Sequence, residues 1–268
     1  AATEYNVDPA IVGPRWEKDI DRQIEILSNV IAQSPEAILL AASDFNRLVP
    51  LAEEAAARGI TIVTLDSALN SDVPVSFVAT DNVTAGEKAG REIDALVAQE
   101  QEIAIVSHIP EVATAIDREK GVRIALAHRA GRIILATFYS ETDPDRAYNI
   151  TQELVEKYPN LGGVVALNEN STVGVGRALK DLGVYDRISL VGFDNSKEEI
   201  QFLEEGIVRA LVVQRPFNMG YLGIRTVVEA LRGRKVEPVI YTDSVLVRKD
   251  EIFTEENQKL LFPIVESR

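Results

Sequence analysis

Apolar and polar residues alternate along the chain in a pattern typical of parallel strands joined by helices. Three apolar, β-rich runs lie at residues 164–167, 188–193 and 210–213, and the segments between them, residues 171–182 and 197–204, have the composition of helices. Runs of this length with helical crossovers predict a parallel sheet that is buried on both faces. The same alternation recurs along nearly the whole chain, and it predicts a doubly wound α/β architecture.

A single polar residue follows each of the three runs: Asn168, Asp194 and Gln214. The carboxyl ends of parallel strands lie at one edge of a sheet, where ligands bind in open α/β folds, so we expect these side chains to converge. Two amides and a carboxylate suit a neutral polyol, whose hydroxyls both donate and accept hydrogen bonds. Asn and Asp are also favoured helix caps, and for each residue taken singly this structural alternative stays open.

A polar interruption at residues 99–102 predicts the first passage of the chain between two lobes. The first lobe comprises residues 1–99 and 215–243, and the second comprises residues 100–214 and 244–268. Three passages of the chain then form a hinge. The expected strands of the first lobe lie at residues 10–12, 37–40, 60–65 and 75–79.

Composition excludes several classes of function. The 268 residues carry a net charge of −14, with 42 acidic against 28 basic residues, which argues against a nucleic-acid partner because such binding depends on Lys and Arg. No apolar run is long enough for a membrane span. The chain has no cysteine and lacks the nucleophile-elbow and P-loop motifs. Its two histidines do not make a metal site by themselves, so we expect a binding protein with no cofactor, no metal and no catalytic residues.

Two further residues are candidate ligand contacts. His108 follows a predicted strand at the expected ligand edge. Trp16 is the single tryptophan and could stack on a sugar face or pack a loop. Both alternatives for Trp16 stay open.

Five motifs along the chain carry a family resemblance. They are VATDN at residues 78–82 followed by Gly86, DREKG at 117–121, ALNE at 166–169, LVGFD at 190–194, and VQRPFNMG at 213–220. In this order and spacing the chain resembles the ribose-binding-protein-like group of type I periplasmic sugar-binding proteins. The resemblance covers the chain from Tyr5 to about Asp250.

The resemblance implies a two-lobed receptor that closes on a sugar and delivers it to the permease of an ABC transporter. Matched motif by motif, it implies that Asp81, Arg118, Asn168, Asp194 and Gln214 hold the sugar hydroxyls, with Asn82 as a further possible contact. It also implies export to the periplasmic or extracellular face of a bacterial membrane, and a lipid anchor at removed N-terminal residues stays open. At residues 111–114 and at residue 144 the sequence departs from the family pattern, so the identity of the bound sugar stays open.

Two alternatives share this fold. One is the effector-binding core of a lactose-repressor-type regulator, which would need a helix-turn-helix and basic residues that are not in this sequence. The other is the sensor domain of a signalling receptor, which would use the same cleft.

The resemblance also makes a prediction about the first lobe. In a flavodoxin-like order of 2-1-3-4-5 the first strand lies between the second and the third, and no counterpart of it is found in this sequence. We therefore expect a further strand between residues 10–12 and 37–40, supplied by upstream residues, a second chain or a rearranged terminus, because buried strands cannot leave their backbone groups unpaired. The protein is otherwise expected to be a monomer.

Overall fold

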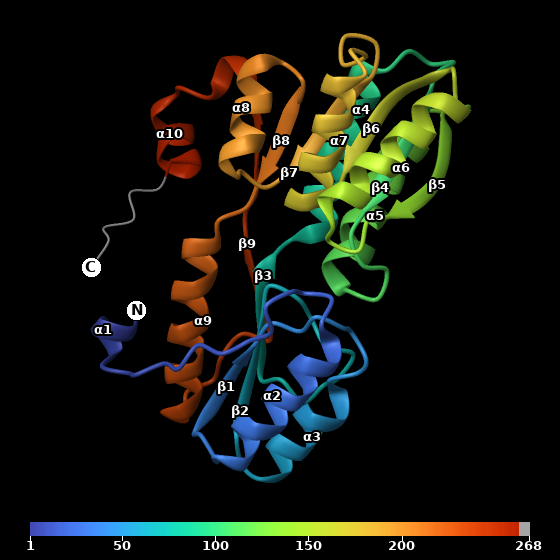
Figure 1. Cartoon of the computed structure of the whole chain (residues 1–268). Helices are drawn as coiled ribbons and strands as arrows, with labels where there is room; N and C mark the ends of the chain where they lie inside the picture. The colour runs from blue at the N-terminus through green and yellow to red at the C-terminus, as the bar shows by residue number, and fades with distance from the viewer. Residues whose placement is uncertain (263–268) are drawn as a thin grey trace. The chain divides into compact units, whose positions relative to one another are not determined.

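The computed structural model describes residues 1–262 and divides the chain into two compact units (Figure 1). The first unit comprises Ala1–Asp81, Glu111–Thr114 and Arg215–Asp243. The second comprises Asn82–Pro110, Ala115–Gln214 and the chain from Ser244 onward. The expected α/β architecture, with a parallel sheet in each of two units, is confirmed.

The first unit is built on a four-stranded parallel sheet of order β1-β2-β3-β9. Its strands are β1 (Ala37–Leu40), β2 (Thr61–Leu65), β3 (Ser76–Thr80) and β9 (Val239–Thr242), and its helices are α1 (Ala2–Tyr5), α2 (Ile20–Ala32), α3 (Val49–Ala57) and α9 (Pro216–Leu231). Leu27 of α2 and Ala52 of α3 join one buried cluster with Ile38 and Ile62 of the sheet. Helix α9 covers the other face, so both faces are buried.

The second unit is built on a six-stranded sheet of order β10-β8-β7-β6-β4-β5, parallel except for the edge strand β10. Its strands are β4 (Glu102–Ser107), β5 (Ile133–Tyr139), β6 (Leu161–Ala166), β7 (Ser189–Phe193), β8 (Ala210–Val213) and β10 (Val245–Arg248). Its helices are α4 (Asn82–Leu96), α5 (Ala113–Ala127), α6 (Pro144–Lys157), α7 (Glu169–Asp181), α8 (Lys197–Glu205), a short 3-10 turn η1 (Lys249–Glu251) and α10 (Glu255–Leu261).

The central strands of this sheet are almost entirely apolar and buried because helices cover both of its faces. Along β4, Ile103 and Ile105 pack with α4 and α5. The intervening Ala104 and Val106 pack on the opposite face in the cluster that includes α6, α7 and α8. Successive strand side chains point to opposite faces, so burial on both sides requires an unbroken apolar run.

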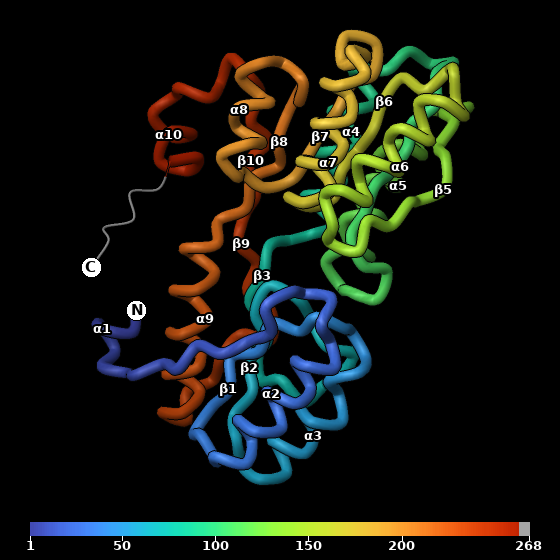
Figure 2. Tube along the Cα trace, in the orientation of Figure 1, coloured from blue at the N-terminus to red at the C-terminus, as the bar shows by residue number. Residues whose placement is uncertain are grey.

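The observed boundary between the units differs from the expected one near Gln99. The chain passes between the units at Asp81/Asn82, Gln214/Arg215 and Asp243/Ser244, and the short segment Glu111–Thr114 also belongs to the first unit; the path of the chain can be followed in Figure 2. Helix α4 belongs to the second unit because Ala85, Ala89 and Ile93 are fully buried in the cluster formed with its sheet. The polar residues at 99–102 are the turn between α4 and β4 within that unit.

The expected strand at residues 10–12 is wrong. This segment has no regular secondary structure, and the Ile11 side chain is 94% exposed. Among residues 1–262, β1 pairs with β2 alone, and no strand lies between residues 10–12 and β1. A strand is held by hydrogen bonds to a neighbour, and residues 10–12 have no neighbouring strand in this part of the chain, so their apolar composition does not by itself produce one.

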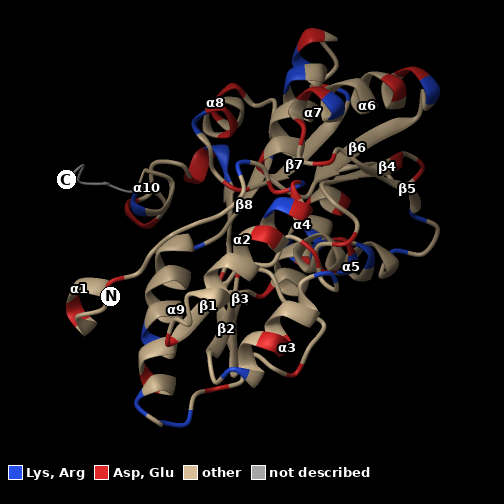
Figure 3. Cartoon of the chain, turned by 60° about the horizontal axis from the view of Figure 1, so that its bottom comes forward, with Lys and Arg blue, Asp and Glu red and all other residues tan. Residues whose placement is uncertain are grey.

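Charged residues lie on the helices and loops, and the strands contain almost none (Figure 3). No helix within residues 1–262 is long and apolar enough to cross a membrane.

Candidate functional site

Six of the predicted ligand residues belong to the second unit. They are Asn82, His108, Arg118, Asn168, Asp194 and Gln214, and we call this set the polar edge. Four of them directly follow, or lie one residue beyond, the carboxyl ends of β4, β6, β7 and β8. These four strands are parallel and adjacent in the sheet, in the order β8-β7-β6-β4. These four residues therefore stand at the strand ends where the sequence argument expected them, and their role as ligand contacts stays a prediction.

Asp194 lies at the centre of the hydrogen bonding at this edge. Its Oδ1 accepts a hydrogen bond from Gln214 Nε2 at 2.6 Å, and its Oδ2 accepts one from the Glu169 backbone N–H at 3.1 Å. The Asp194 backbone has φ of 77°, in the left-handed region that non-glycine residues seldom adopt. Such strain persists where the surroundings hold it, and it is concentrated at functional sites.

The structure decides the capping alternative separately for each strand-end residue. Asn168 is the N-cap of α7, and its Oδ1 accepts from the Ser171 N–H at 3.1 Å. Asp194 does not cap α8, which is capped by Ser196, but its Oδ2 accepts from the first N–H of α7, that of Glu169. Gln214 is not a cap, since the N-cap position of α9 is Arg215. The capping bond of Asn168 uses its carbonyl oxygen, which leaves the amide nitrogen for another role.

Arg118 is held rigidly in the interior, with only 3% of its surface exposed. Its Nε donates to Asn82 Oδ1 at 2.8 Å, and its Nη1 donates to the Leu167 carbonyl at 2.8 Å. The guanidinium carbon lies 4.7 Å from the centre of the Phe193 ring. Leu167 and Phe193 directly precede Asn168 and Asp194, so one cation links two of the strand ends.

Two glycines bring α4 and α5 close enough for the contact between Arg118 and Asn82. A Cβ on Gly86 would lie 2.1 Å from the Arg118 carbonyl oxygen, and a Cβ on Gly121 would lie 2.1 Å from the Val83 carbonyl oxygen. Both clashes are with backbone, which cannot rotate away. Glycine at these two motif positions is therefore required by the helix crossing.

His108 is 2% exposed, and it lies near the guanidinium of Arg118. Burial, and then the positive charge of Arg118, lower the pKa of His108 from 6.5 to about 3. The imidazole is therefore neutral at physiological pH, a form in which one ring nitrogen donates and the other accepts a hydrogen bond.

This lowered pKa predicts acid sensitivity. The unfolded chain binds a proton at His108 below pH 6.5 and the folded protein does not until about pH 3, so stability falls as the pH drops through this window. Chemical denaturation should show that the free energy of unfolding falls between about pH 6.5 and about pH 4.5 by about 2–3 kcal/mol less in His108→Gln than in the wild type. The exposed His128→Gln is the matched control and should leave the loss unchanged. Equal losses in wild type and His108→Gln would contradict the prediction.

The two remaining candidates, Asp81 and Trp16, belong to the first unit. Asp81 directly follows β3, and its N–H donates to the Thr242 carbonyl at 3.4 Å. Trp16 is 56% exposed, and the Arg15 guanidinium lies 5.1 Å from its ring centre. These two contacts lie within the first unit.

Sequence reasoning missed two contributors to the polar edge. Glu169 supplies the N–H that holds Asp194, and burial followed by the Asp194 charge raises the pKa of its own carboxyl. Phe193 supplies the ring beneath Arg118. Each is adjacent to a predicted residue and lies inside a motif, but nothing in the sequence distinguishes a backbone donor or a stacking ring from an ordinary motif neighbour.

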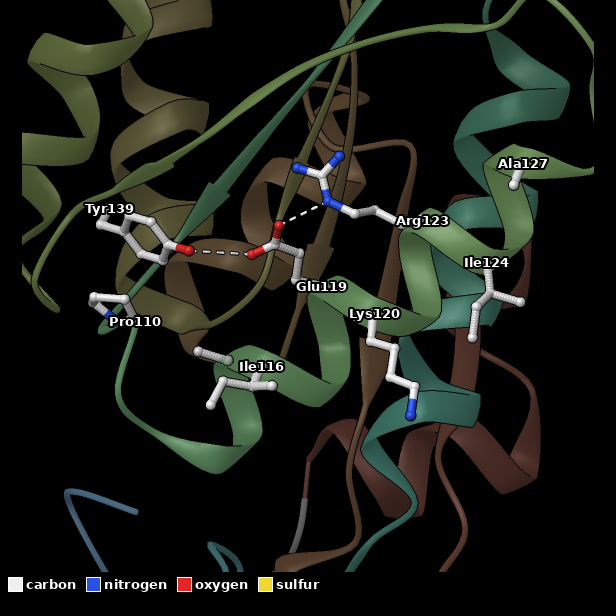
Figure 4. Close-up of a pocket in the computed structure, with 9 residues that line it drawn as sticks. Pro110, Ile116, Glu119, Lys120, Arg123, Ile124, Ala127 and Tyr139 are labelled. Carbon is white, nitrogen blue, oxygen red and sulfur yellow. Dashed lines mark hydrogen bonds and ion pairs between the residues drawn. The ribbon is translucent and has the colours of Figure 1, made fainter. Parts of the chain in front are cut away.

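Within residues 1–262, no group of three or more His, Asp or Glu side chains could hold a metal ion. A pocket of about 560 Å³ lies elsewhere in the second unit, along α5 (Figure 4). Its Glu119 carboxylate accepts hydrogen bonds from Arg123 at 2.7 Å and from Tyr139 at 3.2 Å. None of the polar-edge residues lines this pocket, so this depression and the predicted chemistry are in different places.

Comparison with known proteins gives consistent results. Residues 1–235 match a family model described as a periplasmic binding protein domain. The D-allose-binding periplasmic protein of Escherichia coli is 27% identical over 232 residues, covering 83% of this chain and 74% of that protein. The ribose import binding protein of the same organism is 26% identical over 229 residues, covering 85% and 76%.

Solved structures are similar over nearly the whole chain. A carbohydrate transporter solute-binding protein from Agrobacterium radiobacter, in complex with D-arabinose, has a TM-score of 0.92 and 29% identity and covers 97% of this chain and 90% of that one. An ABC transporter solute-binding protein from Agrobacterium vitis with bound D-fucose has a TM-score of 0.90 and 32% identity, with coverage of 94% and 88%.

Proposed function

We propose, from the premise that the chain belongs to the periplasmic binding protein domain family, that it is the solute receptor of an ABC importer and binds a monosaccharide or related polyol. The observation that carries this proposal is the hydrogen bonding around Asp194. Its carboxylate is fixed by Gln214 and by the Glu169 N–H, so its remaining lone pairs are presented in one orientation. Adjacent sugar hydroxyls are donors that match such a fixed, planar acceptor.

Five of the six polar-edge residues then have roles that follow from their own contacts. Asp194 accepts from two hydroxyls, and Gln214 holds it in place. Asn168 donates through the amide nitrogen that its capping bond leaves unused. Arg118, whose Nε and Nη1 are engaged by the protein, donates to a hydroxyl through Nη2. Asn82 positions Arg118, and Asp81 of the first unit contributes a further acceptor.

The names of similar proteins point to the class of ligand. D-allose, ribose, D-arabinose and D-fucose appear among them, and all are five- or six-carbon sugars. A xylitol-binding protein from Mycolicibacterium smegmatis is 24% identical over 256 residues. We infer an aldopentose, an aldohexose or a short polyol as the ligand. The mixed donor and acceptor set of the polar edge supports a neutral ligand.

The wider assignment rests on the same relatives. We propose an exported protein at the periplasmic or extracellular face of a bacterial membrane, with a membrane-bound permease as its partner. Closure of the two units on the sugar stays a prediction of the family resemblance. The absence of catalysis is likewise a proposal, supported by relatives that are binding proteins.

A thermal-shift screen against pentoses, hexoses and polyols tests the proposed function. A sugar at about 100 times its dissociation constant should add about 2.7 kcal/mol of stability, because it binds the folded state alone. The midpoint should rise by about 2–4 °C for each kcal/mol in chains of about this size. Amino acids and nucleosides at equal concentration serve as controls. A panel in which no sugar or polyol shifts the midpoint, while another class does, would overturn the assignment.

A further inference from the structure

Glu199 is a completely buried carboxyl that follows the loop of residues 194–196 between β7 and α8. We call this segment the Asp194 loop. Glu199 lies in the first turn of α8, and its Oε2 accepts from the Ser196 backbone N–H at 2.7 Å. Ser196 in turn caps the helix, so the two residues form a reciprocal capping box. The other carboxyl oxygen, Oε1, has no hydrogen-bond partner among residues 1–262. One oxygen therefore holds the loop, and the other is buried without compensation.

The charges that act most directly on Glu199 are of its own sign. Asp194 on the preceding loop and Glu169 on α7 are the charges that act on it. Glu198, its neighbour on α8, is paired with Arg177 of α7 at 2.7 Å. On the side of α10, the loop is tied by Asn195 to the carbonyls of Leu260 and Leu261, which carry no charge. The strand packed against α8, β8, is apolar over its whole length.

Such an environment favours the neutral acid. A buried carboxylate without a partner charge is far more costly than a buried neutral carboxyl. Burial is the main cause that raises the pKa of Glu199 well above 4.5, Asp194 raises it further, and the hydrogen bonds from Ser196 lower it by less. The folded protein binds this proton more tightly than the unfolded chain. The resulting stability is complete below pH 4.5 and is lost as the pH rises through the raised pKa.

We propose that Glu199 is a positioning residue for Asp194, whose neutral carboxyl holds the Asp194 loop in its ligand-binding conformation and whose ionisation weakens sugar binding. The inference rests on the proposed function of the polar edge. Asp194 has φ of 77°, so its conformation depends on its surroundings. When Glu199 releases its proton to water, the new buried charge repels Asp194 and Glu169 and draws the first turn of α8 towards solvent. The acceptor presented to the sugar is then displaced.

The test uses the sugar identified by the thermal-shift screen and measures its dissociation constant by calorimetry from about pH 6 to about pH 9. For the wild type, affinity should fall by up to about tenfold for each pH unit above the point at which Glu199 ionises, because one proton is lost per site. Glu199→Gln keeps an oxygen acceptor for the Ser196 N–H and cannot ionise, so its affinity should be constant over this range. Glu204→Gln, an exposed acid on the same helix, is the matched control and should follow the wild type.

A second measurement on the wild type does not depend on a folded variant. If binding requires neutral Glu199, calorimetry in buffers of different ionisation enthalpy should show proton uptake on sugar binding at alkaline pH. Wild-type and Glu199→Gln profiles that coincide, or zero proton uptake over the whole range, would overturn the role of Glu199 while leaving the proposed function intact. A protein that binds no sugar at any pH would overturn both.

Discussion

Replacing Asp194 with Gly should abolish sugar binding and leave the fold intact. The carboxylate is proposed to accept from two hydroxyls, and hydrogen bonds to a charged group contribute about 1.5–3 kcal/mol each. Their loss should raise the dissociation constant by at least about 100-fold, since each 1.4 kcal/mol is about tenfold. Calorimetry with the sugar found in the screen measures this directly.

The stability of the same variant should hardly change. Glycine adopts the φ of 77° without the strain that Asp194 bears, and the variant also removes the negative charge that raises the pKa values of Glu169 and Glu199. The variant also loses the hydrogen bonds from Gln214 and the Glu169 N–H, which lowers its stability. We expect the free energy of unfolding to stay within about 1 kcal/mol of the wild type.

The exposed Asp186→Gly in the same unit is the control, and it should keep full affinity. If Asp194→Gly bound the sugar as tightly as the wild type, Asp194 would be removed from the site. If it unfolded, the residue would have a larger structural role than its half-buried, strained position indicates.

Replacing Gly121 with Ala should lower both stability and affinity. The new methyl would lie 2.1 Å from the Val83 carbonyl oxygen and 2.7 Å from the Glu87 nitrogen, both backbone atoms of α4. The helices must move apart, and overpacking of this kind costs about 1–3 kcal/mol or more. Because the same crossing sets the 2.8 Å contact between Arg118 and Asn82, the guanidinium should be displaced as well. Chemical denaturation and calorimetry measure the two effects.

Gly220→Ala is the matched control, a glycine in the interior of helix α9 with nothing within 4 Å of the added methyl. It should be neutral or stabilising by about 0.5–1 kcal/mol, because Ala is the better helix former. A Gly121→Ala protein with the stability and affinity of the wild type would show that the helix crossing adapts and does not fix Arg118.

The sequence by itself determined the alternation of strands and helices and the positions of three candidate site residues at the strand ends. Periodicity is a local property, so unbroken apolar runs correctly predicted β6, β7 and β8, and their ends correctly placed Asn168, Asp194 and Gln214 in the chain. The motifs correctly indicated the family. The capping box of Ser196 and Glu199 was also readable as a Ser followed three residues later by Glu.

Only the tertiary structure decided which unit α4 joins, whether residues 10–12 form a strand, and what holds the site. Helix α4 has an apolar face suited to either sheet, and its burial against β6 and β7 settles the choice. Residues 10–12 have strand-like composition, but a strand exists only with a hydrogen-bonded neighbour. The cation of Arg118 beside Leu167, and the burial of Glu199 next to Asp194, join residues from separate segments. Such contacts depend on packing between elements, which no local pattern specifies.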